Sequence, residues 1–298
     1  MPTKIQWTHA PGYKGEVWNP VTGCSHVSPG CENCYAERLS HRFGRTTLPW
    51  GAQHAAQNVQ LHPDKLTQPV HWRAPRLIFV NSVSDLFHEL VPDSFLLSVW
   101  LAMSMCPEHR FLVLTKRPER MQRFVTGLQH LPGDHSLFVP AMWPVPNVWL
   151  GVSTEDQRRA DERIPILLQT PAAVRFVSAE PLLGPVDLSI YLATGWDEPP
   201  FDDLLNWVIV GGESGNGARP MDLAWARGIV QQCAAAEVPV FVKQLGAKPV
   251  THPPHYPEGQ DLLLLLNDGK GGDPDEWPED LRIRQWPAGA LAAPTVAP

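Results

Sequence analysis

The sequence predicts an α/β fold, a complete or partial (β/α) TIM-like barrel of about six or seven parallel strands with an irregular C-terminal tail. Two observations support this prediction. Seven short apolar runs are each followed by polar residues, and helical patterns lie between them. Several runs, such as residues 77–80 and 208–210, are apolar without alternation, which is typical of parallel strands buried on both faces. A doubly wound open sheet has the same alternation and remains the alternative.

The predicted strands cover residues 17–21, 76–80, 110–114, 147–152, 173–178, 207–210 and 238–242. The predicted helices cover residues 34–43, 94–106, 118–128, 157–169 and 223–236. Residues 45–73 show no strong period, and we interpret them as a loop-like insertion. After residue 246 the alternation stops and proline and glycine become frequent. We therefore divide the chain into a barrel of residues 1–246 and a C-terminal extension of residues 247–298.

Length and charge limit the classes of function. The chain has 298 residues and a net charge of −7. No apolar segment approaches the roughly 20 residues of a membrane span, and the N-terminus lacks the apolar core of a signal peptide. We expect a cytoplasmic protein that does not contact a membrane, where reduced thiols favour metal binding over disulfides. The charge argues against a surface that is basic throughout, although it allows a local basic cleft for nucleic acid.

Three of the five cysteines, Cys24, Cys31 and Cys34, lie within eleven positions. Six residues separate the first pair and two separate the second, and a turn marked by Pro29 and Gly30 can fold the segment back on itself. Three thiolates that converge on one place suit a soft metal ion or an iron–sulfur cluster. Three cysteines would leave one iron of a four-iron cluster free for a small ligand.

Two other interpretations of this segment stay open. A tetrahedral zinc site needs a fourth ligand, for which His9, His26 or His41 are the candidates. The three thiols can also be unrelated to any metal. Cys233 lies in a helical pattern and Cys106 precedes Pro107, where burial as a small apolar residue is the default, so we interpret both as structural.

Polar residues follow the other predicted strands directly. In parallel α/β folds, ligands bind at the carboxyl ends of the strands, so these residues are expected to surround one mouth with the cysteines on its rim. Polar strand ends are also common simply because they face solvent, which accounts for part of the pattern. The candidates are Asn81, Ser82, Lys116, Arg117, Ser153, Glu180, Gly211, Gly212, Glu213, Ser214 and Lys243.

The segment Gly211-Gly212-Glu213-Ser214 is the second strong signal. Glycines let the backbone approach a ligand closely, and the carboxylate of Glu213 can accept a hydrogen bond from an ammonium group. A tight turn with a capping carboxylate explains the same residues without a ligand.

Three cations also follow strands. Lys116, Arg117 and Lys243 can bind a carboxylate or a phosphate, or can be solvated charges at strand ends. Glu180 and Glu213 can act as a carboxylate pair in a hydrolase. That alternative predicts an activity that survives the loss of all three cysteines.

Several segments resemble the phage and bacterial three-cysteine-motif proteins. They include Trp-Asn-Pro-Val-Thr-Gly-Cys at 18–24 and Ser-Pro-Gly-Cys-Glu-Asn-Cys-Tyr-Ala-Glu-Arg at 28–38. Residues 81–88, 150–155, 177–184, 208–215, 241–246 and 277–282 match as well, so the resemblance covers nearly the whole chain. This family has long been carried as a domain of unknown function in phage genomes and is regarded as radical-SAM-like. Some of its members are encoded beside a dedicated partner protein.

The resemblance implies an iron–sulfur enzyme on a barrel. Cys24, Cys31 and Cys34 would ligate a 4Fe–4S cluster that cleaves S-adenosylmethionine (SAM) and starts radical chemistry on a substrate, for which a nucleic acid or nucleotide is the candidate. The usual radical SAM motif has three residues between its first two cysteines, whereas this chain has six.

Two sets of residues receive roles in this hypothesis. The residues expected to contact SAM are Asn81, Ser82, Ser153, Gly211, Gly212, Glu213 and Ser214. The residues expected to handle substrate or protons are Lys116, Arg117, Glu180 and Lys243. The alternative is a non-enzymatic zinc or cluster-binding module that recognises nucleic acid or a partner protein.

Overall fold

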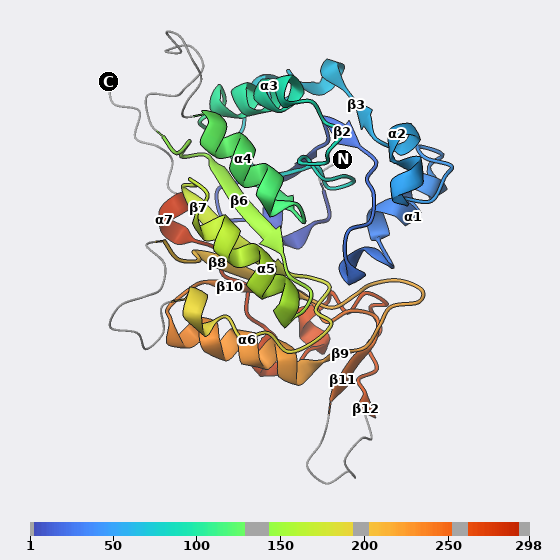
Figure 1. The fold of residues 1–298 in the computed structure, drawn as a ribbon. Coiled ribbons are helices and arrows are strands. Elements are labelled where there is room, and N and C mark those ends of the chain that lie inside the picture. The colour runs from blue at the N-terminus through green and yellow to red at the C-terminus, as the bar shows by residue number, and fades with distance from the viewer. Residues whose placement is uncertain (1–2, 129–142, 193–202, 252–261, 292–298) are drawn as a thin grey trace.

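Seven parallel strands form the main sheet of the protein (Figure 1). The structure is a computed structural model and describes residues 3–128, 143–192, 203–251 and 262–291. The order in the sheet is β1-β4-β5-β6-β7-β8-β10. The bounds are β1 (Lys14–Trp18), β4 (Arg76–Val80), β5 (Arg110–Thr115), β6 (Val148–Ser153), β7 (Val174–Ala179), β8 (Trp207–Gly211) and β10 (Val240–Gln244).

The strand order confirms a TIM-like partial barrel. Each strand pairs in parallel with the next main strand along the chain. A doubly wound sheet reverses its order at a switch point, and this sheet does not, so that alternative is wrong. The sheet curls into a half-barrel with helices on its outer side (Figure 1). Six of the predicted strands are present at nearly their predicted bounds, with most of their residues buried. The first was predicted too late: β1 spans Lys14–Trp18 at the edge of the sheet with Lys14 exposed, and Val21 belongs to β2.

Four helices cover the outer face of the sheet, namely α3 (Asp93–Ser104), α4 (Pro118–Leu128), α5 (Gln157–Leu168) and α6 (Leu223–Ala235). Their apolar sides pack on outward residues of the strands in one continuous core. Asp156 caps α5 and Asp222 caps α6, each by accepting a backbone N–H at 2.8 Å. No helix in the described part of the chain has both the length and the apolar character needed to cross a membrane.

The concave face of the sheet is filled by aromatic rings. Trp7, in the short helix η1 (Gln6–Thr8), lies 4.7 Å from Phe79 and 6.1 Å from Trp207 between ring centroids. A methyl group on Gly151 would come within 2.5 Å of the Phe176 ring, so glycine makes room for that ring. The interior is therefore a packed core, as in other parallel barrels.

The cysteine segment and the insertion after it form a separate layer. The helices of this layer are short: η2 (Pro29–Cys31), α1 (Tyr35–Arg42), η3 (Ala52–His54), α2 (Ala55–Asn58), η4 (Pro63–Lys65) and η5 (Pro69–His71). β2 (Val21–Thr22) pairs antiparallel with β3 (Gln60–Leu61). The predicted insertion, residues 45–73, therefore contacts the cysteine segment through this strand pair. Its Trp50, which is 2% exposed, packs beside Cys24 and Cys34.

The C-terminal extension runs along the edge of the sheet. Ile283 and Gln285 exchange backbone hydrogen bonds with β10 at 2.8 and 3.0 Å, and Trp277 is 2% exposed. The other elements are η6 (Ser189–Tyr191), β9 (Met221–Asp222), β11 (Pro249–Thr251), β12 (Leu262–Leu263), η7 (Pro274–Glu276), η8 (Glu279–Leu281) and α7 (Ala288–Leu291). Described residues of the extension, such as Trp277 and Leu281, pack on the barrel core.

Candidate cysteine site at the carboxyl end of the sheet

A cavity of about 130 Å³ lies where β4, β5 and β6 end, and the cysteine segment forms one side of it. It brings together eight of the residues expected to form a site. They are Cys24, Cys31, Cys34, Asn81, Ser82, Lys116, Arg117 and Ser153. The rule that strand ends share one mouth therefore holds for three neighbouring strands.

The three cysteines reach the cavity from three local structures. Cys24 follows β2, Cys31 ends η2, and Cys34 occupies the position before α1. All three thiols are free and half-buried. Burial raises the pKa of Cys24 to about 12, although the charge of Arg117 pulls it down. Burial also raises the pKa of Cys34. Thiolates at these positions therefore need a bound cation to offset their charge, as a metal would provide.

A single zinc ion and an iron–sulfur cluster make different demands on the three thiols. Within the described residues, no group of three or more His, Cys, Asp or Glu side chains is arranged to hold one metal ion. A zinc ion needs four donors at about 2.0–2.3 Å from one point. In a 4Fe–4S cluster each thiolate binds a different iron, so the sulfur atoms need not meet at one point.

The histidines that were candidates for a fourth zinc ligand have other partners. His26 Nε2 is 2.8 Å from Glu37 Oε2, and His41 Nε2 is 3.0 Å from the Leu48 carbonyl oxygen. His9 Nε2 is 2.8 Å from the carbonyl oxygen of Thr3. Of the three, only His26 lines the cysteine cavity.

Arg117 is buried against Cys24. Its Nη1 donates to Cys24 Sγ at 3.6 Å and to Asp85 Oδ2 at 3.2 Å. Its Nε donates to Glu89 Oε1 at 3.0 Å, and its Nη2 donates to the carbonyl and hydroxyl oxygens of Ser25, both at 3.1 Å. Burial lowers the pKa of Arg117, but Asp85, Cys24 and Glu89 outweigh burial and raise it. The guanidinium is thus fully engaged within the protein.

Asn81 and Lys116 offer donors to the cavity. Asn81 is 2% exposed, and its side-chain nitrogen has no hydrogen-bond partner among the described residues. Its backbone adopts a φ of 59°, which asparagine tolerates better than most residues. Lys116 is half-buried, and its ammonium group has no ion-pair partner in the described ranges. A buried unpaired donor costs about 1–3 kcal/mol, so the Asn81 amide nitrogen is a donor available to a group in the cavity.

Glu155 fixes the cysteine segment to the end of β6. Its carboxylate is fully buried, accepts the backbone N–H of Gly30 at 3.1 Å and pairs with Arg163 at 2.9 Å. Burial alone would raise the pKa of Glu155, but the charges of Arg163 and Lys116 outweigh it and hold the pKa below its usual value.

Glu213 lies outside the cavity lining and fixes the same segment from the end of β8. Its carboxylate accepts from Asn33 at 2.9 Å and from Arg219 through Nε at 3.0 Å and Nη2 at 2.6 Å. Arg219 also donates to the Pro29 carbonyl oxygen at 3.0 Å. That Glu213 accepts from the SAM amino group stays a prediction, and both its oxygens already have partners.

Close packing explains why glycine occupies positions 211 and 212. A methyl group on Gly212 would lie 2.4 Å from the Leu245 carbonyl oxygen, and one on Gly211 would lie 3.3 Å from Glu180. The carbonyl oxygen of Ser214 accepts from Arg38 of α1 at 2.7 Å. Neither glycine nor Ser214 lines the cysteine cavity.

Glu180 and Lys243 form an ion pair with each other at the ends of β7 and β10. Both are half-buried, and neither lines the cysteine cavity. The two carboxylates of the hydrolase alternative are therefore each paired with a cation, Glu180 with Lys243 and Glu213 with Arg219.

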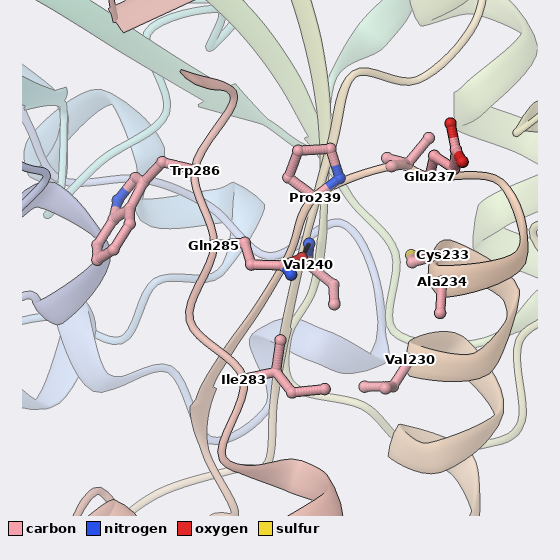
Figure 2. A pocket seen from close by; sticks show the side chains of 10 residues that line it. Val230, Cys233, Ala234, Glu237, Pro239, Val240, Ile283, Gln285 and Trp286 are labelled. Atoms are coloured by element: carbon pink, nitrogen blue, oxygen red, sulfur yellow. Dashed lines mark hydrogen bonds between the residues drawn. The ribbon is translucent and has the colours of Figure 1, made fainter.

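A larger cavity of about 520 Å³ lies away from the predicted residues (Figure 2). The end of α6, the amino end of β10 and the segment 283–286 line it, mostly with apolar side chains such as Val230, Val240 and Ile283. It opens near the first residue of β10, whereas the cysteine cavity lies where strands end. None of the residues predicted to form a site lines it.

Sequence reasoning assigned no site role to several residues that shape the cysteine site. Tyr35 and Trp50 line the cavity, and Asp85 anchors Arg117. Asn33 and Arg219 fix the cysteine segment through Glu213. Tyr35 and Asn33 flank Cys34 directly and Asp85 follows a predicted strand, so position alone could have flagged those three.

Comparison with protein families gives one match. The model of a family described as a protein of unknown function, DUF5131, matches residues 2–266. Comparisons with curated proteins and with solved structures found no significant match. The family match spans the cysteine segment, all seven strands of the half-barrel and the residues of the cavity. By this match over most of its length, the chain belongs to the DUF5131 family.

Proposed function

We propose that this chain is an iron–sulfur enzyme of the radical SAM type, in which Cys24, Cys31 and Cys34 hold a 4Fe–4S cluster and SAM is the second cofactor. The observation that carries the proposal is the shared cavity. Three free, half-buried thiols line it together with Asn81 and Lys116 from two neighbouring strand ends. This is a thiolate donor set at the place where parallel α/β folds bind their ligands.

The size of the cavity favours a compact group beside the cysteines. Pockets for organic ligands span about 300–1,000 Å³, and this cavity measures about 130 Å³. A cluster would therefore occupy the space next to the sulfur atoms, and SAM would extend over the rim. When bound, the cluster supplies the electron that cleaves SAM and starts radical chemistry.

The protein's own residues bind, orient and exclude water in this proposal. The Asn81 amide and the Lys116 ammonium group donate to anionic or carbonyl groups of the bound ligand. Trp50 is 2% exposed and shields Cys24 and Cys34 from solvent. The Glu180–Lys243 ion pair is proposed to handle substrate or a proton, since it lies at the same end of the sheet.

Metal analysis on protein purified and reconstituted without oxygen tests the proposal. We expect about four irons per chain, a brown protein that dithionite bleaches, and release of 5′-deoxyadenosine from SAM. Cys31→Ala is expected to abolish iron binding. Cys233→Ala is the matched control, because Cys233 is also a free cysteine but lies buried in α6, away from the cysteine cavity.

Two results would contradict the proposal. Full iron content in Cys31→Ala would remove that residue from the ligand set. A colourless wild-type protein that holds one zinc ion would favour the alternative, a non-enzymatic zinc module. For the substrate, we keep the proposal of a nucleic acid or nucleotide, which rests on the family resemblance. It is tested by whether single-stranded DNA, RNA or nucleotides accelerate 5′-deoxyadenosine release.

A further inference from the structure

We infer that Arg117 is a positioning residue that raises the reduction potential of the cysteine-bound cluster through its hydrogen bond to Cys24. The inference rests on the proposed function. It starts from one contact, the 3.6 Å distance between Arg117 Nη1 and Cys24 Sγ. Cluster potentials depend on hydrogen bonds to the sulfur atoms and on local charge, so this contact acts on the property that decides when a cluster accepts an electron.

The contacts of Arg117 favour a positioning role over the direct contact with substrate that the sequence predicts. Arg117 was expected to handle substrate, but it is 5% exposed and its three nitrogen atoms all donate to protein acceptors. A planar guanidinium held at several points cannot turn towards another ligand without breaking several bonds. The same rigidity keeps Nη1 directed at Cys24.

The surrounding charges show why the hydrogen bond matters more than the net charge. Asp85 is buried beside Arg117 and offsets its charge at 3.2 Å. Glu89 pairs with Arg117 from a side chain that is 64% exposed, and His88 and Lys116 are the other titratable groups close by. The charges of Arg117 and buried Asp85 cancel at a distance, and solvent screens the exposed carboxylate of Glu89. The N–H group, in contrast, contacts the sulfur directly.

The expected direction follows from electrostatics. Reduction adds one electron from an external reductant to the cluster and places more negative charge on its sulfur ligands. A hydrogen bond from a charged donor is strongest to the more negative acceptor. The bond therefore stabilises the reduced state more than the oxidised state, and its loss lowers the potential.

Redox titration of the reconstituted protein, followed by electron paramagnetic resonance, tests the inference. Removing Arg117 alone would leave Asp85 buried without a partner, so the first variant is the double substitution Arg117→Gln with Asp85→Asn. It removes one positive and one negative charge together and so isolates the hydrogen bond. The second variant, Arg117→Lys, keeps the charge and loses the planar fork. Arg120→Gln is the control, because Arg120 pairs with Asp93 and does not line the cavity.

We expect the double variant to bind the same amount of iron as wild type. At a fixed potential its ratio of reduced to oxidised cluster should be about tenfold lower, which corresponds to about 59 mV for one electron. Arg117→Lys should shift the ratio in the same direction by less, and Arg120→Gln should not shift it.

Two outcomes overturn the inference while the proposed function stands. One is a wild-type potential in both Arg117 variants at full iron content. The other is loss of iron from both variants, which would mean that Arg117 holds the cysteine segment in place and does not set the reduction potential of the cluster. If wild-type protein takes up no cluster, the proposed function itself has failed.

Discussion

The ends of β4–β6 and the end of β8 are equally polar in sequence but use their polar groups in opposite ways. Around the cysteine cavity, Asn81 has a side-chain nitrogen without a partner among the described residues, and Lys116 lacks an ion pair there. At the end of β8, Glu213 already accepts hydrogen bonds from Asn33 and Arg219. The ends of β4–β6 present donors to a cavity. At the end of β8, the carboxylate of Glu213 accepts hydrogen bonds that hold the cysteine segment in place.

The comparison teaches that polar residues at strand ends differ in whether the protein itself already satisfies their hydrogen bonds. The partners of Glu213 come from the cysteine segment and from the loop before β9, positions that a local pattern does not connect. If the distinction is right, substitutions in the two regions should separate stability from ligand binding. The following predictions address that separation.

The largest effect is expected at Glu155, which lies beside the cavity but acts as a structural anchor. Glu155→Ala leaves buried Arg163 without its carboxylate and should lower the free energy of unfolding by about 3–5 kcal/mol. The pKa of Glu155 lies below its usual value of 4.5, so the carboxylate stabilises the fold above that pH and loses this contribution as the pH falls below it. Urea titrations should show the difference from wild type shrinking below pH 4.5. A difference that is constant with pH would contradict this role.

The next largest effect is expected at Glu213. Glu213→Ala removes the acceptor of Arg219 and Asn33 and should cost about 2–3 kcal/mol of stability. Urea or thermal unfolding measures the loss. A variant as stable as wild type that no longer binds SAM would break the comparison, because it would make Glu213 a ligand contact after all.

A smaller effect is expected from a pair of glycine substitutions. A methyl group on Gly212 meets the Leu245 carbonyl oxygen at 2.4 Å, so Gly212→Ala should destabilise the protein by about 1–3 kcal/mol. Gly228 lies within α6 with open space around it. Gly228→Ala should stabilise the protein by about 0.5–1 kcal/mol. Calorimetric melting temperatures of the two variants should move in opposite directions, and equal shifts would contradict the packing argument.

The smallest effect on stability is expected at Lys116. Lys116→Gln removes no ion pair among the described residues and should change stability by less than about 0.5 kcal/mol. The same substitution should weaken SAM binding to the reconstituted protein about tenfold, because it removes a cation from the cavity. Calorimetric titration measures the affinity. An unchanged affinity would show that Lys116 does not face the ligand.

Much of the fold could be predicted because its strands carry a local signal. Residues 77–80 and 208–210 are apolar throughout, and both runs are strands with buried neighbours on each face. The convergence of Cys24, Asn81 and Lys116 on one cavity followed from the common polarity of parallel strands.

The rest depended on contacts between distant residues. The segment 45–73 has no period of its own, because β3 is ordered by pairing with β2 and Trp50 by packing beside the cysteines. The anchoring of Arg117 could not be predicted either, since Cys24, Ser25 and Asp85 reach it from other elements.

The tilted aromatic rings under the cysteine cavity have a consequence for access to the thiols. Phe79 lines the cysteine cavity and stands on Trp7 at 4.7 Å, so the floor of the cavity is continuous with the aromatic core. The barrel interior offers no corridor to the opposite end along these residues. A small molecule that reaches the thiols therefore does not pass through the aromatic core.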